Sequence, residues 1–289
     1  MRGLFRDFLA HLKSLNRADA TIRKWQGIYN VFCDHFRHDD VTRVTKADVR
    51  AWRDKLLEDR GASTVKRAHL PAISAAFSWA VEEDRLPENP AKGVKQVATK
   101  TTVGRPKGFS DAEALAIIKY TCAYRPKLDE WGRIREAEGM TRTKQWVPIL
   151  CALTGARVAE VTQLRCEDVR EEDGVHFLRI TPDAGGNKSH QYRDVPLHDQ
   201  IVKLGFLKVV EGVGAGPLFY DGEVDYTKAQ RQGNRLATWL RGAGLVPEGL
   251  QPNHAWRHRF QTLGRRYSQS EMVINAICGH GRQGDVSHS

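Results

Sequence analysis

A basic stretch that is poor in apolar residues divides this sequence into two parts of unequal length. It reads AKGVKQVATKTTVGRPKG (residues 91–108), with glycine and proline among several lysines. Such a composition does not build a packed helix or strand and is typical of a connector. We therefore expect a first domain at 1–95, a basic linker at 96–108 and a second domain at 109–289. A chain of 289 residues is long enough for two hydrophobic cores.

The first part carries apolar residues at the three- and four-residue spacing of amphipathic helices. Two such stripes are Leu4, Phe5, Phe8, Leu9 and Leu12, then Ile22, Trp25, Tyr29, Phe32 and Phe36. A third helix is expected from the cap Thr45, with Asp48 in its first turn, to Gly61. The fourth is expected over 63–86, with Ser63 as its N-cap and a kink at Pro71, which removes a backbone donor. The first domain is therefore predicted to be a helical bundle.

The second part mixes helices with short strands. Ser110 and Glu113 form a capping box, with Phe109 as a hydrophobic staple, before the first helix. The polar segment 126–145 is predicted to be a surface insertion, and the apolar helix after it to end at Thr154-Gly155. The segments VHFLRIT (175–181) and QYRDVPL (191–197) have the composition of strands. The fold class is therefore predicted to be mainly α with a small β-sheet, that is, α+β.

The formal net charge of +10 favours a polyanion as partner. The surplus is shared, because residues 1–95 carry 18 Lys and Arg against 13 Asp and Glu, and residues 96–289 carry 27 against 22. Two basic domains would suit a clamp around duplex DNA, and an ordinary soluble surface with a basic bias is the alternative.

Neither a membrane span nor a disulfide framework is expected. No apolar run approaches the roughly 18 residues that a membrane helix needs, and the N-terminus is not typical of a signal peptide. The five cysteines are scattered and form no CxxC pair. This pattern favours a reducing cytoplasm and argues against a zinc ribbon.

Several basic residues occupy positions where ligands commonly bind. Arg157 follows Gly155 and Ala156 at the mouth of a helix, where the short neighbours leave room for a ligand. His254 and Arg257 lie three residues apart and share one face of a helix. His258 lies four residues after His254, which leaves open a zinc site with Cys278 or His280 as third ligand, although no HExxH motif is present.

The order of these residues resembles the tyrosine recombinases, or phage integrases, over nearly the whole chain. The matching positions are Arg157 in TGARVAEVTQL, Lys188 in the hairpin before VPLH, His254 and Arg257 in HAWR, and His280 in GH. The resemblance implies that residues 1–95 form a core-binding, SAM-like DNA-binding domain. It also implies that residues 109–289 form the catalytic domain.

The resemblance further implies site-specific breaking and rejoining of DNA through a 3′-phosphotyrosine. Arg157 and Arg257 would hold the phosphate oxygens, Lys188 would act as general acid, His254 and His280 would manage protons, and Glu160 would orient the site. DNA contacts are expected from Lys66, Arg67, Arg105 and Lys107. No cofactor or metal is required. The implied partners are duplex DNA, three further copies in a homotetramer on DNA, and accessory DNA-bending proteins, in the cytoplasm of a bacterial or prophage host.

The nucleophilic tyrosine of this family follows the GH histidine by about nine or ten residues. No tyrosine lies between His280 and Ser289, and Tyr267 is expected to pack rather than react. We therefore expect this chain to end about one residue before the nucleophile and to be inactive in cleavage by itself. A truncated form or a non-catalytic DNA-binding integrase remnant is the alternative, and a zinc hydrolase built on His254 and His258 is a third hypothesis.

Overall fold

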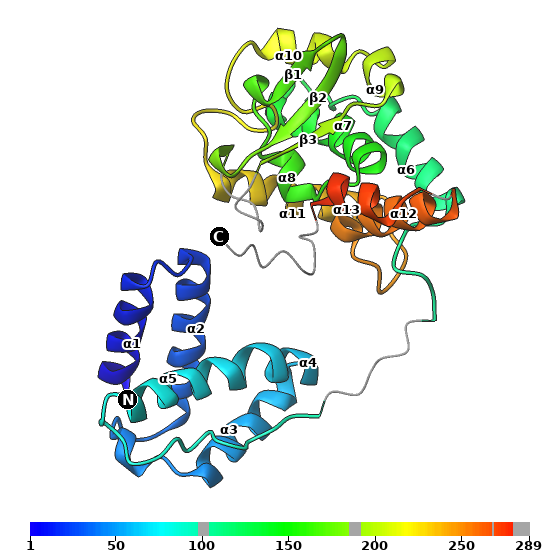
Figure 1. Ribbon diagram of the computed structural model, residues 1–289. Helices are drawn as coiled ribbons and strands as arrows, with labels where there is room; N and C mark the ends of the chain where they lie inside the picture. The colour runs from blue at the N-terminus through cyan, green and yellow to red at the C-terminus, as the bar shows by residue number, and fades with distance from the viewer. Residues whose placement is uncertain (98–103, 185–191, 268, 280–289) are drawn as a thin grey trace. The chain divides into compact units, whose positions relative to one another are not determined.

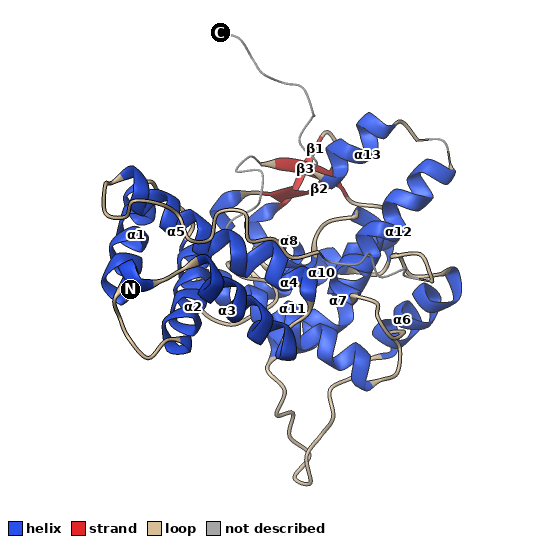
Figure 2. Ribbon diagram, turned by 90° about the horizontal axis from the view of Figure 1, so that it is seen from below, coloured by secondary structure: helices blue, strands red, loops and turns tan. Residues whose placement is uncertain are grey.

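The structure is a computed structural model that describes residues 1–97, 104–184, 192–267 and 269–279 (Figure 1). The chain divides into two compact units, Met1–Thr102 and Val103–Ser289. Helices dominate both, and the one sheet within the described residues is three-stranded and lies in the second unit (Figure 2). The predicted α+β class is confirmed. None of the described helices is long and apolar enough to cross a membrane.

The first unit is a helical bundle built around aromatic side chains. Its elements are α1 (Arg2–Ser14), α2 (Asp19–His35), a 3₁₀ turn (Val41–Arg43), α3 (Lys46–Asp59), α4 (Ala62–Thr64), a π-helical turn (Val65–His69) and α5 (Leu70–Glu82). Phe32 is fully buried. Its ring centroid lies 4.9–5.8 Å from those of four other aromatic rings, Phe5, Phe36, Trp52 and Phe77. The apolar stripes of α1 and α2 thus form the core of this unit.

The caps of the first unit differ in part from those expected. Thr45 and Asp48 form a capping box at the start of α3, as predicted. α3 ends at Asp59 with Arg60 as its C-cap, so Gly61 follows the helix directly as predicted, but its φ of −62° is not left-handed and it serves as the N-cap of α4. Ser63 lies within α4 and is not an N-cap. The expected irregularity at Pro71 takes the form of the π-helical turn, since the missing N–H at Pro71 leaves the preceding turn free to widen.

The second unit packs its helices around a small antiparallel sheet. Its elements are α6 (Asp111–Ala123), α7 (Glu138–Thr154), α8 (Val158–Thr162), β1 (Val169–Glu172), β2 (Val175–Ile180), β3 (Arg193–Pro196), α9 (Asp199–Lys203), α10 (Phe206–Val213), α11 (Tyr226–Gly242), α12 (Pro252–Arg266) and α13 (Glu271–Cys278), with 3₁₀ turns at Cys166–Asp168 and Pro182–Ala184. The strand order is β1-β2-β3. Leu178 of β2 pairs with Val169 and Val195 and is fully buried, so one face of the sheet enters the core.

One boundary of the second unit was mispredicted and one strand was missed. Residues 126–145 are not all insertion, because α7 begins at Glu138. Strand β1 was not expected, since three of its four residues are charged. The capping box of Ser110 and Glu113 is confirmed at the start of α6. Phe109 is buried against the ring of Trp256, with 4.7 Å between the ring centroids.

Replacing Phe32 by alanine should test the aromatic core of the first unit. We expect the free energy of unfolding to fall by about 3–5 kcal/mol, because the change leaves a cavity among four rings. Urea denaturation followed by circular dichroism measures it. Leu15→Ala, at an exposed position after α1, is the control and should change stability by no more than about 0.5 kcal/mol. Equal losses in the two variants would contradict this account of the core.

Candidate functional site

The turn between α7 and α8 presents Arg157. Gly155 ends α7 with a φ of +64°, a left-handed conformation that side chains disfavour. A Cβ at this position would also lie 2.5 Å from the ring of Phe260, so only glycine is accommodated. The chain then turns through Ala156 and places Arg157 as the N-cap residue of α8. The predicted helix boundary and the placement of Arg157 at a helix mouth are therefore both observed.

Arg257 reaches the same turn from α12. Its Nη1 donates a hydrogen bond to the carbonyl oxygen of Gly155 at 3.0 Å, across 102 residues of sequence, and its Nη2 donates to the carbonyl oxygen of Cys278. The residue is only 6% exposed. Burial lowers the pKa of the Arg257 guanidinium, and the nearby charge of Arg157 acts in the same direction. The fold thus brings the two predicted arginines to one point.

Glu160 is the anion of this cluster. Its carboxylate accepts hydrogen bonds from the Arg157 backbone N–H at 2.9 Å and from Arg157 Nη1 at 2.6 Å. It also accepts one from Arg193 Nη2 at 2.6 Å. Glu160 is 3% exposed. Burial alone would raise the pKa of Glu160, but the hydrogen bonds and charges of Arg193 and Arg157 outweigh it and hold the pKa below the usual range.

Arg193 belongs to the cluster and was missed in the sequence. It is the first residue of β3 and donates from Nε to the carbonyl oxygen of Ile277 at 2.9 Å, as well as to Glu160. The alternation of buried and exposed side chains along β3 could have revealed it. Side chains two apart in a strand share a face, and Val195 is in the core. An arginine on the buried face of a strand requires an anionic or carbonyl partner, which predicts a site.

The first turns of α12 carry His254 and His258 on the exposed side of the helix. Partial desolvation lowers the pKa of the His258 imidazole, and the charges of Lys107, His254 and Arg257 lower it further. Lys107 and His254 are therefore both near enough to His258 to act on its charge. Two neighbouring side chains, Asn253 and His254, also line a hollow of about 370 Å³ between α11 and α12.

The α11 side of this hollow is polar and basic. Asn234, Thr238 and Arg241 line it. With Arg231 and Arg235 they form an exposed stripe at helical spacing along α11. We call this set, Arg231, Asn234, Arg235, Thr238 and Arg241, the α11 stripe. It was not singled out in the sequence, although a helix with one apolar face and an opposite basic face is the signal that would have indicated it.

The other predicted DNA contacts lie in different settings. Lys66 and Arg67 are exposed on the π-helical turn of the first unit. Arg105 is tied to the second unit by an ion pair with Glu113, with 2.7 Å between Nη2 and Oε2. Lys188 and His280 lie outside the described residues. The structure therefore gathers Arg157, Glu160 and Arg257 at one turn, and places His254 beside α11.

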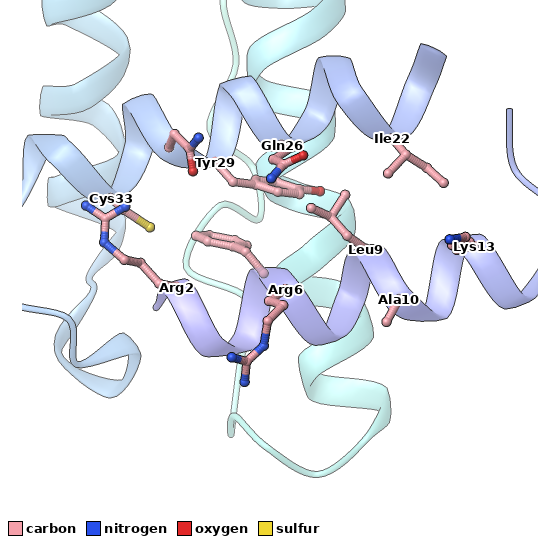
Figure 3. Close-up of a pocket in the computed structure, with 11 residues that line it drawn as sticks. Arg2, Arg6, Leu9, Ala10, Lys13, Ile22, Gln26, Tyr29 and Cys33 are labelled. Atoms are coloured by element: carbon pink, nitrogen blue, oxygen red, sulfur yellow. The ribbon is translucent and has the colours of Figure 1, made fainter. Parts of the chain in front are cut away.

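A second hollow, of about 310 Å³, lies in the first unit between α1 and α2 (Figure 3). Leu9 of α1 and Ile22 of α2 line it, and the stacked rings of Phe5 and Tyr29, whose centroids are 4.4 Å apart, lie beside them. Arg2 at one end is paired with Asp34 at 2.7 Å. The lining is mainly apolar and holds no acid–base constellation.

The zinc hypothesis finds no support within the part of the chain that the structure describes. No group of three His, Cys, Asp or Glu side chains is placed there to hold a metal ion. Cys278 is fully buried, and this burial raises the pKa of its thiol, which disfavours the thiolate that zinc requires. His280, the other suggested ligand, lies beyond the described residues.

The expectation for Tyr267 is wrong. The side chain follows α12 and is 69% exposed, so it does not pack into the core. Arg265 and Arg266 lie in the last turn of α12, where positive charges interact favourably with the carbonyl end of the helix dipole. Tyr267 follows them at the surface.

Glu160→Gln should destabilise the protein in a pH-dependent manner. At pH 7 the change leaves two partly buried arginines without their anion, at a cost of about 3–5 kcal/mol. The folded pKa of Glu160 is lowered, so its stabilisation is complete above the unfolded value of about 4.3 and is lost as pH falls through the folded pKa. Chemical denaturation at several pH values measures the difference between variant and wild type, which should shrink below about pH 4. Glu58→Gln, in an exposed pair with Lys55, is the control. A difference that stays constant with pH would contradict the role of the carboxylate.

The chain was also compared with known proteins as a whole. No protein-family model matches the sequence. A curated protein of Desulfatibacillum aliphaticivorans, named methylthioribose-1-phosphate isomerase, is 23% identical over 258 residues. The match covers 85% of this chain, and the chain spans 60% of the length of that relative. The name of this relative and the names of the similar solved structures describe different chemistries.

Three solved structures are similar over almost the entire chain. A lambda integrase dimer bound to a COC′ core site has a TM-score of 0.69 at 16% identity, covering 98% of this chain and 95% of that chain. The Tn1549 transposon integrase in complex with circular intermediate DNA has a TM-score of 0.68 at 16% identity, covering 97% and 91%. The XerH site-specific recombinase bound to a difH substrate has a TM-score of 0.63 at 17% identity, covering 98% and 78%. The chain therefore has the fold of the tyrosine recombinases.

Proposed function

We propose that this protein is a tyrosine-type site-specific DNA recombinase. It binds duplex DNA and, in its full-length form, breaks and rejoins strands through a 3′-phosphotyrosine. The observation that carries the proposal is the meeting of Arg157 and Arg257 at the Gly155 turn. Arg257 donates a hydrogen bond to the carbonyl oxygen of Gly155, which lies 102 residues before it in the sequence. The similar solved structures, which are complexes with DNA, support it.

The two arginines suit a phosphodiester in the course of attack. Displacement at phosphorus adds negative charge to the two non-bridging oxygens, and guanidinium groups stabilise that charge with paired hydrogen bonds. Each guanidinium has five N–H donors. Arg257 donates two of its hydrogen bonds to backbone carbonyls and Arg157 donates one to Glu160, so donors on both remain for a phosphate. The electrostatic repulsion between the two arginines also favours binding of an anion.

The remaining steps are assigned on the resemblance. The tyrosine oxygen forms a bond to phosphorus as the bond from phosphorus to the 5′-oxygen breaks, and Lys188 gives that oxygen its proton. His254 and His280 donate hydrogen bonds or hold the proton of the nucleophile. The phosphotyrosine conserves the energy of the broken bond, so rejoining requires no nucleotide cofactor.

DNA binding is proposed to use the α11 stripe together with the basic residues near it. Lys107 acts electrostatically on His258 of α12, and three residues of the α11 stripe, Asn234, Thr238 and Arg241, line the adjacent hollow. Lys66 and Arg67 would add contacts from the first unit. A homotetramer on DNA is proposed because a lambda integrase tetramer bound to a Holliday junction is among the similar structures; accessory DNA-bending proteins and a cytoplasmic location remain expectations of the resemblance.

Neutralising Arg231, Arg235 and Arg241 as glutamines should weaken binding to duplex DNA. Each phosphate contact that is lost should lower the slope of log affinity against log salt by about one. Fluorescence anisotropy with a labelled duplex at several salt concentrations measures the slope. Arg170→Gln, at an exposed position on β1, serves as the matched control and should leave the slope unchanged. An α11 variant with the wild-type slope would exclude the stripe from the interface.

Cleavage should depend on both clustered arginines. In a full-length protein that carries the nucleophilic tyrosine, Arg157→Ala or Arg257→Ala should slow formation of the covalent adduct by roughly a hundredfold or more. A suicide substrate with the cognate site and denaturing gel electrophoresis measure the adduct.

A covalent adduct through Tyr267, or metal-dependent hydrolysis, would contradict the proposed mechanism. Specific DNA binding without cleavage by the full-length protein would favour the alternative, a non-catalytic DNA-binding integrase remnant.

A further inference from the structure

Arg193 joins three elements that lie far apart in the sequence. From the first position of β3 it donates Nη2 to Glu160 Oε2 at 2.6 Å and Nη1 to Glu160 Oε1 at 3.4 Å. Its Nε donates to the carbonyl oxygen of Ile277 in α13 at 2.9 Å. The side chain is 12% exposed. A guanidinium with this degree of burial, and with three bonds inside the protein, is placed to organise its neighbours.

The first consequence concerns Arg157. Glu160 holds Arg157 through its side chain and its backbone N–H, and Arg193 holds Glu160 from the other side. A buried carboxylate between two guanidiniums has few other orientations, because each rotation would leave charged groups without a partner. The position of the Arg157 guanidinium is thus fixed through Glu160 by a residue of the sheet.

The second consequence concerns the end of α13. Arg193 and Arg257 donate to its last two carbonyls, those of Ile277 and Cys278, which are the groups that a helix leaves without internal partners. Gly279 follows with a φ of +63°, and a Cβ there would lie 2.7 Å from Arg193 Nη1. The guanidinium therefore lies directly against the backbone that leads to position 280.

We propose that Arg193 is a positioning residue of the site: through Glu160 it fixes Arg157, and through the Ile277 carbonyl it fixes the end of α13. The role in catalysis rests on the function proposed above, whereas the role in fixing α13 does not. Arginine suits this place because its planar fork presents separate donors to a carboxylate and to a carbonyl at once. A lysine at this position offers a single nitrogen, which cannot reproduce both sets of bonds.

Thiol reactivity tests the effect on α13 in the chain itself. Cys278 is fully buried at the end of α13, and Cys122 is exposed, so the measurement is made in a Cys122→Ser background. Arg193→Ala should raise the rate at which Cys278 reacts with a thiol reagent by roughly tenfold or more, because the helix end opens locally. Arg193→Lys should have an intermediate rate.

Arg179→Ala is the matched control. Arg179 also forms two hydrogen bonds to one carboxylate, that of Asp194, at 2.8 and 2.7 Å, but on the surface of the sheet. The Arg179→Ala variant should therefore have the wild-type reactivity of Cys278. If Arg193→Ala does not fold, Arg193→Lys provides the comparison. A wild-type rate in the folded Arg193 variants would overturn the proposal.

Cleavage kinetics test the effect on Arg157. In the full-length protein at saturating DNA, Arg193→Ala should lower the single-turnover cleavage rate by about a hundredfold, the typical effect of misplacing a catalytic group. Its affinity for duplex DNA should stay at the wild-type value, because the Arg193 side chain is largely buried and its donors are used inside the protein. Arg179→Ala should change neither quantity.

The outcomes separate the two proposals. A wild-type cleavage rate for Arg193→Ala, or a loss of DNA affinity that accounts for the whole loss of rate, would overturn the positioning role. If the wild-type protein cleaves no DNA, the proposed function fails, and the reactivity of Cys278 still decides whether Arg193 fixes α13.

Discussion

A carboxylate buried between two guanidiniums organises the second unit of this protein. Glu160 is almost inaccessible to water, and an unpaired anion in such a place is strongly unfavourable. Its partners come from its own helix cap, Arg157, and from strand β3, Arg193. The pairing therefore holds the small sheet and the α7–α8 turn in one arrangement. Among the described residues no carboxylate forms an ion pair with Arg257, which donates to the carbonyl oxygens of Gly155 and Cys278 instead.

Much of the site could be predicted because its signals are local. Gly155 before Arg157 marks a helix end and a helix start within a few residues, and the structure places both there. The spacing of His254 and Arg257 indicates one helix, and α12 contains them. Such local patterns cannot predict that α12 meets the turn before α8, because that contact depends on packing across the unit. The resemblance to a known family supplied the expectation of this meeting.

The errors have physical causes. Arg193 was passed over because QYRDVPL was interpreted by composition and not by alternation, although the buried Val195 two positions later shows which face enters the core. Strand β1 was not predicted because three of its four residues are charged. It is an edge strand that pairs only with β2, and edge strands tolerate exposed charged residues. Tyr267 was expected to pack because aromatic residues often do. It lies after the last turn of α12, where no element covers it.

The linker is also less independent than its composition suggests. Arg105 is paired with Glu113, and a Cβ at Gly108 would lie 2.8 Å from the backbone of Arg259. The last residues of the linker thus belong structurally to the second unit.

The π-helical turn at Val65–His69 has a consequence for how such a helix can evolve. A π turn corresponds to one extra residue in an α-helix, and each residue advances the helix by about 100°. The face that α5 buries is therefore out of phase with the face on which Lys66 and Arg67 lie. Loss or gain of a single residue in this turn would rotate Lys66 and Arg67 around the helix axis relative to Ile73 and Phe77, and would rotate the fully buried Val65 with them. An insertion or deletion in this turn can therefore move the basic pair over the surface of the bundle only together with a change in the core beneath it.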